Sequence, residues 1–346
     1  MSKKSEEPQV AVSSPRETTS LYGHNEAEAT LLDAYRGGQC PHAWLIGGAQ
    51  GIGKATLAYR MARFVLAQPL PQAASVQSAS SLAIDAGHPA ARHIAAGTHG
   101  GLLVLERTLN DRGVLRTEIS VDNVRETVAF FGSTAAAGGW RVCIVDTAEE
   151  LNANSANALL KVLEEPPARS LFLLVSNAPA RVLPTIQSRC RKLKLRPLDP
   201  ADVVRAAADA AEIAPTDASL QEVSALAEGS VARALMLLGG ATLGLQQRME
   251  TMLQALPQVD PKALHGLGDA LAGTDRVALL TFADTVERWL GRQLAGSDPK
   301  ADLPRLARLS EVWEKVTRAV RDTQDYNLER KPLVFSVFGM LAEAMR

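Results

Sequence analysis

The chain has 346 residues, of which 46% are hydrophobic and 22% charged, and its net charge is −1. This composition is typical of a soluble globular protein with two or three domains. The near-neutral charge argues against an electrostatic grip on DNA by the whole surface. No apolar run reaches the roughly 18 residues that a membrane span needs, so we expect no membrane partner and a cytoplasmic location.

Residues 1–20 are polar and lack the apolar segment of a signal peptide, which predicts a disordered N-terminal tail. Three cysteines, Cys40, Cys143 and Cys190, are widely spaced and never form a CxxC pair. An odd number at such spacing argues against a disulfide framework and against a cysteine zinc site.

Between residues 21 and 198, short apolar runs alternate with helical stretches. Each run is bounded by Gly, Asp, Asn or Pro, a pattern that predicts an α/β domain with a parallel sheet covered by helices on both faces. Residues 67–92 interrupt the pattern and are predicted to be an irregular insertion. The apolar runs are HAWLIGG, GLLVLER, WRVCIVD and SLFLLVSN.

After residue 198 the sequence has almost no short apolar runs of the kind that predict strands. Residues 199–243 are predicted to form three short helices that end at Gly or Pro. Residues 246–346 are predicted to form longer amphipathic helices, since large apolar residues recur there at intervals of three or four. The clearest set is Leu279, Phe282, Val286, Trp289 and Leu290.

A glycine-rich stretch, GGAQGIGK, follows the first apolar run. Gly48, Gly53 and Lys54 match the spacing G-x-x-x-x-G-K, with Gly51 between them. Glycines at this spacing let the backbone and a helix N-terminus cradle phosphate oxygens, and Lys54 would reach the β and γ phosphates. The next position should carry the hydroxyl that holds Mg²⁺, but it is Ala55. Thr56 is rotated about 100° round the helix and is a poor substitute.

Asp146 ends the run WRVCIVD, where an aspartate helps to hold Mg²⁺ through water. It also suits a helix N-cap, and both roles are compatible. P-loop proteins that hydrolyse ATP usually carry Glu directly after this aspartate, where it orients the attacking water. This chain has Thr147 there, and we do not expect Glu149 or Glu150 to take over that role. The departures at positions 55 and 147 predict poor or absent ATP hydrolysis and weak or absent ATP binding.

Two stretches, NALLKVLEEPP at 157–167 and LPTIQSRC at 183–190, closely resemble the AAA+ subunits of bacterial clamp loaders, and most of all the delta-prime family of DNA polymerase III. The resemblance implies a RecA-like AAA+ α/β domain at 21–198, a helical lid at 199–243 and an all-α oligomerisation collar at 246–346. It is carried further by YGHNEAEATLLDAYRGGQCPHAWLIGG, GTHGGLLVLER, ISVDNVRE and NLERKPLVFSVFGMLAEA.

The resemblance also implies a function. Such a subunit is the stationary scaffold of a pentameric ring with gamma/tau and delta subunits, which loads the sliding clamp onto primed DNA with ATP and without independent catalysis by this subunit. Arg189 matches the arginine finger that reaches a neighbour's ATP, although the basic run RCRKLKLR alone suggests a surface arginine.

Arg233 matches a sensor arginine of the lid, which pins the lid when no nucleotide is bound. Asn177 takes the first sensor position, but Asn is also a common strand terminator. Many relatives carry a four-cysteine zinc module where residues 67–92 lie. That segment has no cysteine, so we expect no zinc and interpret His88 and His93 as ordinary loop histidines.

Two alternatives remain. A gamma/tau-type motor subunit of the same loader should carry Ser or Thr at position 55 and Glu at position 147, which this chain does not. A small-molecule P-loop kinase would leave the helical C-terminal third and the SRC motif unexplained.

Overall fold

The computed structural model describes residues 14–109, 116, 118–132, 139–238, 241–272, 276–295, 303–326 and 328–345. The chain divides into two compact units, Met1–Leu235 and Met236–Arg346. Each unit is built around buried apolar clusters of its own.

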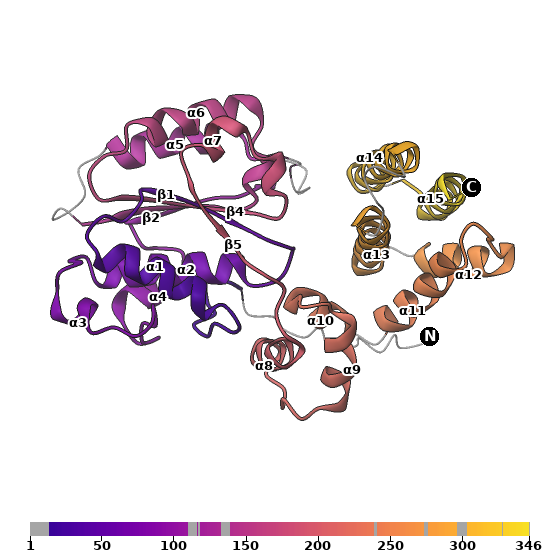
Figure 1. The fold of residues 1–346 in the computed structure, drawn as a ribbon, viewed down its shortest axis with the longest axis horizontal. Coiled ribbons are helices and arrows are strands. Elements are labelled where there is room, and N and C mark those ends of the chain that lie inside the picture. The colour runs from indigo at the N-terminus through magenta and orange to yellow at the C-terminus, as the bar shows by residue number, and fades with distance from the viewer. Residues whose placement is uncertain are drawn as a thin grey trace, which may run out of the picture. The chain divides into compact units, whose positions relative to one another are not determined.

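A five-stranded sheet forms the centre of the first unit (Figure 1). The four pairings of neighbouring strands are all parallel, which confirms the predicted α/β class. The strands lie in the order β2-β3-β4-β1-β5. Their bounds are β1 (Ala43–Gly47), β2 (Leu102–Leu105), β3 (Arg141–Val145), β4 (Ser170–Ser176) and β5 (Arg191–Lys194).

Helices cover both faces of this sheet, because side chains along each strand alternate between the two faces. Trp44 and Ile46 pack into one core, while Ala43 and Leu45 pack into the other. The first face is covered by α1 (Asn25–Arg36), α2 (Lys54–Ala67) and α4 (Pro89–Ala95), and the second by α5 (Val121–Gly132), α6 (Ala153–Glu164) and α7 (Pro184–Gln187) (Figure 1).

Strand β5 was not among the predicted strands. Its sequence RKLK is dominated by charge, and three of its four residues are exposed because it lies at the edge of the sheet. Leu193 packs against the core and Leu195, just beyond the strand, is buried. Charged residues are common on edge strands because they discourage pairing with other chains.

Two predictions about irregular segments need correction. The predicted disordered tail includes residues 1–13, which lie outside the described residues, but residues 14–20 run along α2. The Arg63 guanidinium there donates to the carbonyls of Pro15, Arg16 and Thr18. The predicted irregular insertion contains the short helix α3 (Ala74–Gln77) and the start of α4.

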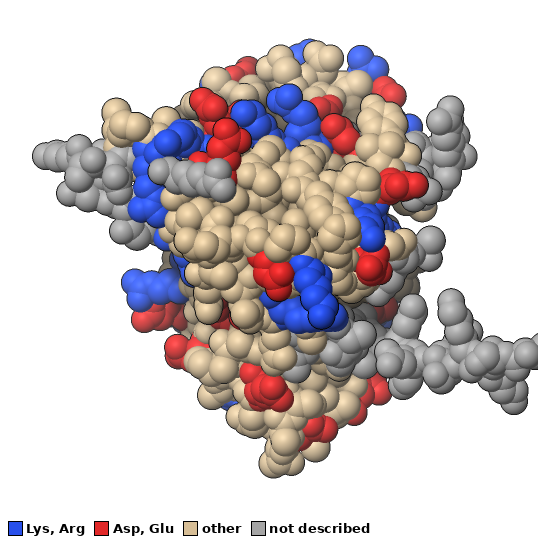
Figure 2. Space-filling model, turned by 90° about the vertical axis from the view of Figure 1, so that its right-hand side faces the viewer, with Lys and Arg blue, Asp and Glu red and all other residues tan. Residues whose placement is uncertain are grey.

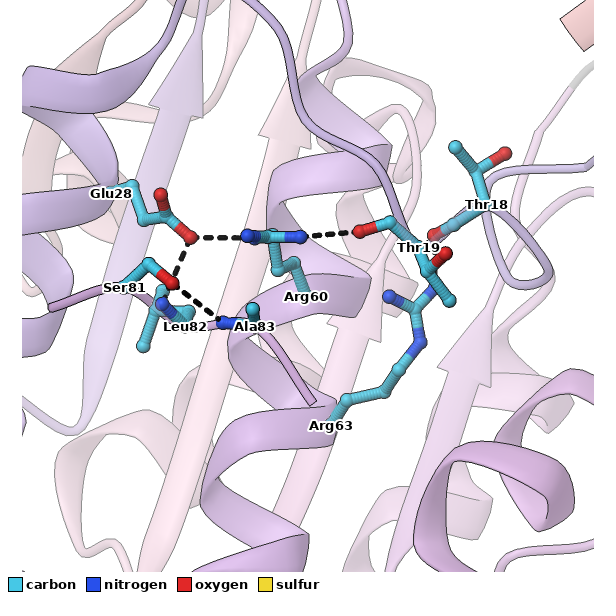
Figure 3. A network of polar contacts seen from close by, with 8 residues as sticks. All are labelled: Thr18, Thr19, Glu28, Arg60, Arg63, Ser81, Leu82 and Ala83. Carbon is cyan, nitrogen blue, oxygen red and sulfur yellow. Dashed lines mark hydrogen bonds and ion pairs between the residues drawn. The ribbon is translucent and has the colours of Figure 1, made fainter. Parts of the chain in front are cut away.

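A buried ion pair ties these segments to the helices (Figure 3). Arg60 Nε lies 2.5 Å from Glu28 Oε1, and both side chains are nearly buried. The same carboxylate oxygen accepts the Leu82 N–H at 2.9 Å, while Arg60 also donates to the Thr19 carbonyl. Glu28 therefore connects the insertion, α1 and α2, and through Arg60 the segment before α1.

Three short helices follow the sheet, over the residues where the sequence predicts them, and the first unit ends within the third of them. They are α8 (Pro200–Ala211), α9 (Ala218–Leu226) and α10 (Val231–Leu237). Gly229 lies before α10, and its carbonyl accepts the Leu198 N–H at 3.1 Å.

The secondary structure of the second unit's described residues consists of helices joined by turns and short irregular segments, as predicted. The large apolar residues of the predicted pattern, from Leu279 to Leu290, are buried in its core and thus stabilise the unit itself. The same core includes Leu245, Met249 and Leu253 of α11 (Ala241–Gln254), so this helix packs with the second unit. The helices that follow it are α12 (Pro261–Leu271), α13 (Arg276–Ala295), α14 (Leu303–Asp325) and α15 (Arg330–Ala344).

The charges are mixed on the face of the molecule that Figure 2 shows. Basic and acidic side chains are interspersed there around an uncharged area. This distribution agrees with the net charge of −1. None of the described helices is long and apolar enough to span a membrane.

We predict that Glu28→Ala lowers the free energy of unfolding by about 3 kcal/mol, because it strands a buried guanidinium and the Leu82 N–H. Urea unfolding measures this loss. The control is Asp122→Ala, which removes an ion pair to Arg125 whose side chains are 81% and 70% exposed, and which should cost less than about 1 kcal/mol. Equal losses in the two variants would contradict the role given to Glu28.

Candidate functional site: a glycine loop and an arginine on opposite edges of the sheet

The glycine loop has the predicted strand–loop–helix arrangement. Gly48 directly follows β1, and its N–H donates to the Ser176 carbonyl at 3.2 Å. Gly53 has a φ of 97° and caps α2, which begins at Lys54. The loop thus lies where the carboxyl ends of the parallel strands meet, which is the end of the sheet at which open α/β folds bind ligands.

Carbonyls of this loop already accept hydrogen bonds from elsewhere in the first unit. The Ile52 oxygen lies 2.6 Å from Nε2 of His24, which must carry the hydrogen because a carbonyl can only accept. The Gly51 oxygen accepts the Val231 N–H of α10 at 2.9 Å. Gly51 has a φ of 74°, and a Cβ there would lie 2.3 Å from Ser230 Oγ, so only glycine allows this close approach.

Lys54 is buried and turns back onto its own loop. Its ammonium donates to the Ala49 carbonyl. Burial lowers the pKa of Lys54 to about 8, while the carboxylates of Glu149 and Asp146 act in the opposite direction. Neither Ala55 nor the half-buried Thr56 supplies the hydroxyl that a magnesium site needs at position 55.

Asp146 follows β3 at the same edge as the loop. Its pKa is raised by burial and by Glu106, and Lys54 offsets part of this effect. Asp146 does not begin a helix: Thr147 precedes the 3₁₀ turn η2 (Ala148–Glu150), and Asn152 caps α6 by accepting the Ser155 N–H at 2.9 Å. Thr147 has a φ of 60°, which β-branched residues rarely adopt.

The two glutamates of this turn have different partners. Glu150 accepts the Thr147 hydroxyl at 2.5 Å and pairs with Arg107 Nε at 2.8 Å. Glu149 accepts the Asn177 N–H at 2.9 Å through one oxygen. Its other oxygen is buried with no hydrogen-bond partner among the described residues. Glu150 is therefore held by two side chains, and Glu149 by one backbone N–H.

The two predicted sensor residues lie in different surroundings. Asn177 follows β4, next to β1, and so lies at the loop's edge of the sheet. Arg233 is 4% exposed, and its Nε donates to the Leu226 carbonyl at 3.0 Å. This contact joins α9 and α10.

Arg189 lies at the opposite end of the strands, where their amino ends meet. It precedes β5, and Arg191 at the start of β5 pairs with Trp44 at the start of β1. The glycine loop follows the other end of β1, and the shared length of these strands alone is about 10 Å. The Arg189 side chain is 35% exposed and lies 2.7 Å from Glu164 of α6.

Sequence reasoning did not single out His24. Its signal, a lone histidine before a helix, is too weak to find, because the contact to Ile52 is purely tertiary. The loop histidines have local roles: His88 caps α4 through the Ala90 N–H, and His93 lies 3.3 Å from the Thr98 hydroxyl. Within the described ranges, no three His, Cys, Asp or Glu side chains gather as metal ligands.

Comparison with known proteins decides the family. The model of the family described as DNA polymerase III, delta subunit, matches residues 23–199. This chain belongs to that family. The matched residues contain the whole sheet, with β5 and β1 at one side and β3 and β2 at the other.

Individual relatives agree with this assignment. The delta-prime subunit of DNA polymerase III from Pseudomonas aeruginosa is 42% identical over 152 residues, which are 44% of this chain and 42% of that protein. The delta-prime subunit from Escherichia coli K12 is 33% identical over 232 residues, which are 65% and 62% of the two chains. The chain thus spans less than two thirds of the length of these relatives.

A more distant relative covers more of the chain. The gamma/tau subunit of DNA polymerase III from Mycobacterium tuberculosis is 29% identical over 335 residues, covering 91% of this chain and 53% of that protein. The predicted resemblance to delta-prime subunits is confirmed by the first two relatives and by the family match.

We predict that Lys54 loses its proton near pH 8 in the folded protein, well below the ordinary value of 10.5. The charged amine therefore destabilises the fold below pH 8, and this cost disappears as the pH rises toward 10.5. An NMR titration of lysine-labelled protein, with Lys54→Met to assign the signal, measures the midpoint. A midpoint near 10.5 would exclude the buried environment described above.

Proposed function

We propose that this chain is the stationary scaffold subunit of a DNA polymerase III clamp loader, and that Arg189 acts as an arginine finger on ATP bound by a neighbouring subunit. The supporting observation is the place of Arg189. It lies at the edge of the sheet opposite the chain's own glycine loop, so a phosphate it contacts belongs to another molecule. Arginine suits this task because it stays charged and presents a planar fork of donors.

The glycine loop supports the same division of roles. Position 55 lacks the magnesium hydroxyl, position 147 lacks the glutamate, and the carbonyls of Gly51 and Ile52 are engaged by α10 and His24. These contacts favour a loop that holds the first unit together over one that exchanges nucleotide. ATP binding by this chain is accordingly weak or absent.

The remaining parts follow from this role. Residues 21–198 form the AAA+ domain, 199–243 the lid, and 246–346 the collar through which the chain joins a pentameric ring with gamma/tau and delta subunits. The sliding clamp and primed DNA are contacted through the assembled complex, in the cytoplasm. The mixed charges of the face in Figure 2 agree with a subunit that has no DNA-binding surface there.

The second candidate is an ATP-hydrolysing motor of the gamma/tau type. It is favoured by the gamma/tau relative that aligns with 91% of this chain. The residues at positions 55 and 147 weigh against it, because a motor needs the magnesium hydroxyl and the glutamate there.

We expect the isolated chain to bind Mg-ATP no more tightly than about 100 μM, because the loop cannot hold the metal. Calorimetric titration of the purified chain measures the affinity. A dissociation constant in the low micromolar range would mean that Lys54 and the backbone suffice, and would favour the motor.

We expect Arg189→Ala to lower ATP turnover and clamp loading by the reconstituted complex. The site that Arg189 serves should slow by about 10³-fold or more, while other sites in the ring keep some activity. Lys54→Ala should do far less. Assembly and folding should persist, since an exposed side chain contributes little stability. If Lys54→Ala abolishes loading and Arg189→Ala is silent, the chain is a motor.

A further inference from the structure

The backbone that carries Arg189 is firmly anchored. One residue of the short helix α7 and one on each side of it pack into the core between the sheet and α6, with exposures of 1% at Ile186, 2% at Val182 and 8% at Cys190. The Arg189 N–H donates to the Ile186 carbonyl at 3.1 Å. The base of the side chain is therefore fixed, and only the guanidinium needs to be oriented.

Three contacts orient that guanidinium. Nη1 donates to the Thr185 carbonyl at 2.9 Å and to the Ser188 hydroxyl at 3.3 Å. Nη2 donates to Glu164 Oε1 at 2.7 Å. Glu164 is the contact from another element, since Thr185 and Ser188 belong to the same turn as Arg189. The Nε–H has no partner among the described residues, so the fork keeps a donor for an incoming oxyanion.

Glu164 is at a position that its own helix does not favour. It is the last residue of α6, where the negative end of the helix dipole opposes an acidic side chain. The helix ends there because Pro166 disfavours helical geometry at Glu165. A residue that its local secondary structure disfavours, such as an acidic side chain at a helix C-terminus, is commonly retained because function requires it. The guanidinium of Arg189 compensates the charge at this helix end.

We propose that Glu164 is a positioning residue for Arg189, which holds the guanidinium in the direction of the neighbouring subunit's phosphate before ATP is bound there. This inference rests on the proposed role of Arg189 as a finger. Glu164 is half exposed, so the ion pair is weak and screened, and a phosphate competes with it without a large penalty. What Glu164 supplies is orientation, because a free arginine side chain samples many rotamers.

The test is ATP turnover by reconstituted complexes in which the other subunits carry alanine in place of their own SRC arginine. Turnover then reports the site that this chain completes. Glu164→Ala should lower kcat roughly two- to five-fold and leave KM for ATP unchanged, because the finger acts in the transition state. Glu164→Gln keeps an acceptor at the same place and should restore most of the rate.

The matched control is Glu165→Ala, the neighbouring exposed glutamate, which should match the wild type. The double variant Glu164→Ala with Arg189→Ala should be no slower than Arg189→Ala alone, because Glu164 acts only through Arg189. The thermal midpoint of Glu164→Ala should fall by no more than about 2 °C, which separates positioning from loss of fold.

The outcomes separate the two hypotheses. If Arg189→Ala has no effect in these complexes, the proposed function fails. If Arg189→Ala abolishes turnover but Glu164→Ala matches or exceeds the wild type, the finger stands and the positioning role is wrong. An additional loss from Glu164→Ala in the Arg189→Ala background would also overturn it.

Discussion

The parallel pairing of β1 and β5 is the constraint on which the functional account depends. Because parallel strands run in the same direction, a segment that follows β1 and a segment that precedes β5 must lie at opposite edges of the sheet. The glycine loop is the first of these segments and Arg189 belongs to the second. The fold thus keeps Arg189 away from the glycine loop of its own chain.

Polar groups of the glycine loop, which has the spacing of a phosphate-binding loop, are hydrogen-bonded to other parts of the same chain. Lys54 donates to the Ala49 carbonyl, His24 binds Ile52, and Val231 at the start of α10 binds Gly51. Each contact satisfies a polar group that burial would otherwise leave unpaired, which costs free energy. The loop therefore connects the α/β layers with the segment before α1 and with the start of α10.

Much of this arrangement could be predicted from the sequence, because it rests on local patterns. Apolar runs bounded by turn residues predicted four strands, and the glycine spacing predicted the start of α2 at Lys54. Strand β5 was missed since its alternation, Leu193 then Leu195, is hidden among basic residues.

The errors at residues 14–20 and in the insertion have another origin. Both segments have the composition of irregular chain, but Arg63, Arg60 and Glu28 bind their backbones from helices far away in the sequence. Such tertiary hydrogen bonds leave no periodic signal. The same reason explains why His24 and the contact between Glu164 and Arg189 emerged only from the structure, whereas SRC itself was recognisable as a motif.

The most direct test is a structure of the assembled complex with a non-hydrolysable ATP analogue, the clamp and primed DNA. Our account predicts that the Arg189 guanidinium lies within about 3 Å of a γ-phosphate oxygen on the adjacent subunit, and that the glycine loop of this chain holds no nucleotide. Nucleotide bound at Lys54, with Arg189 facing solvent, would contradict it.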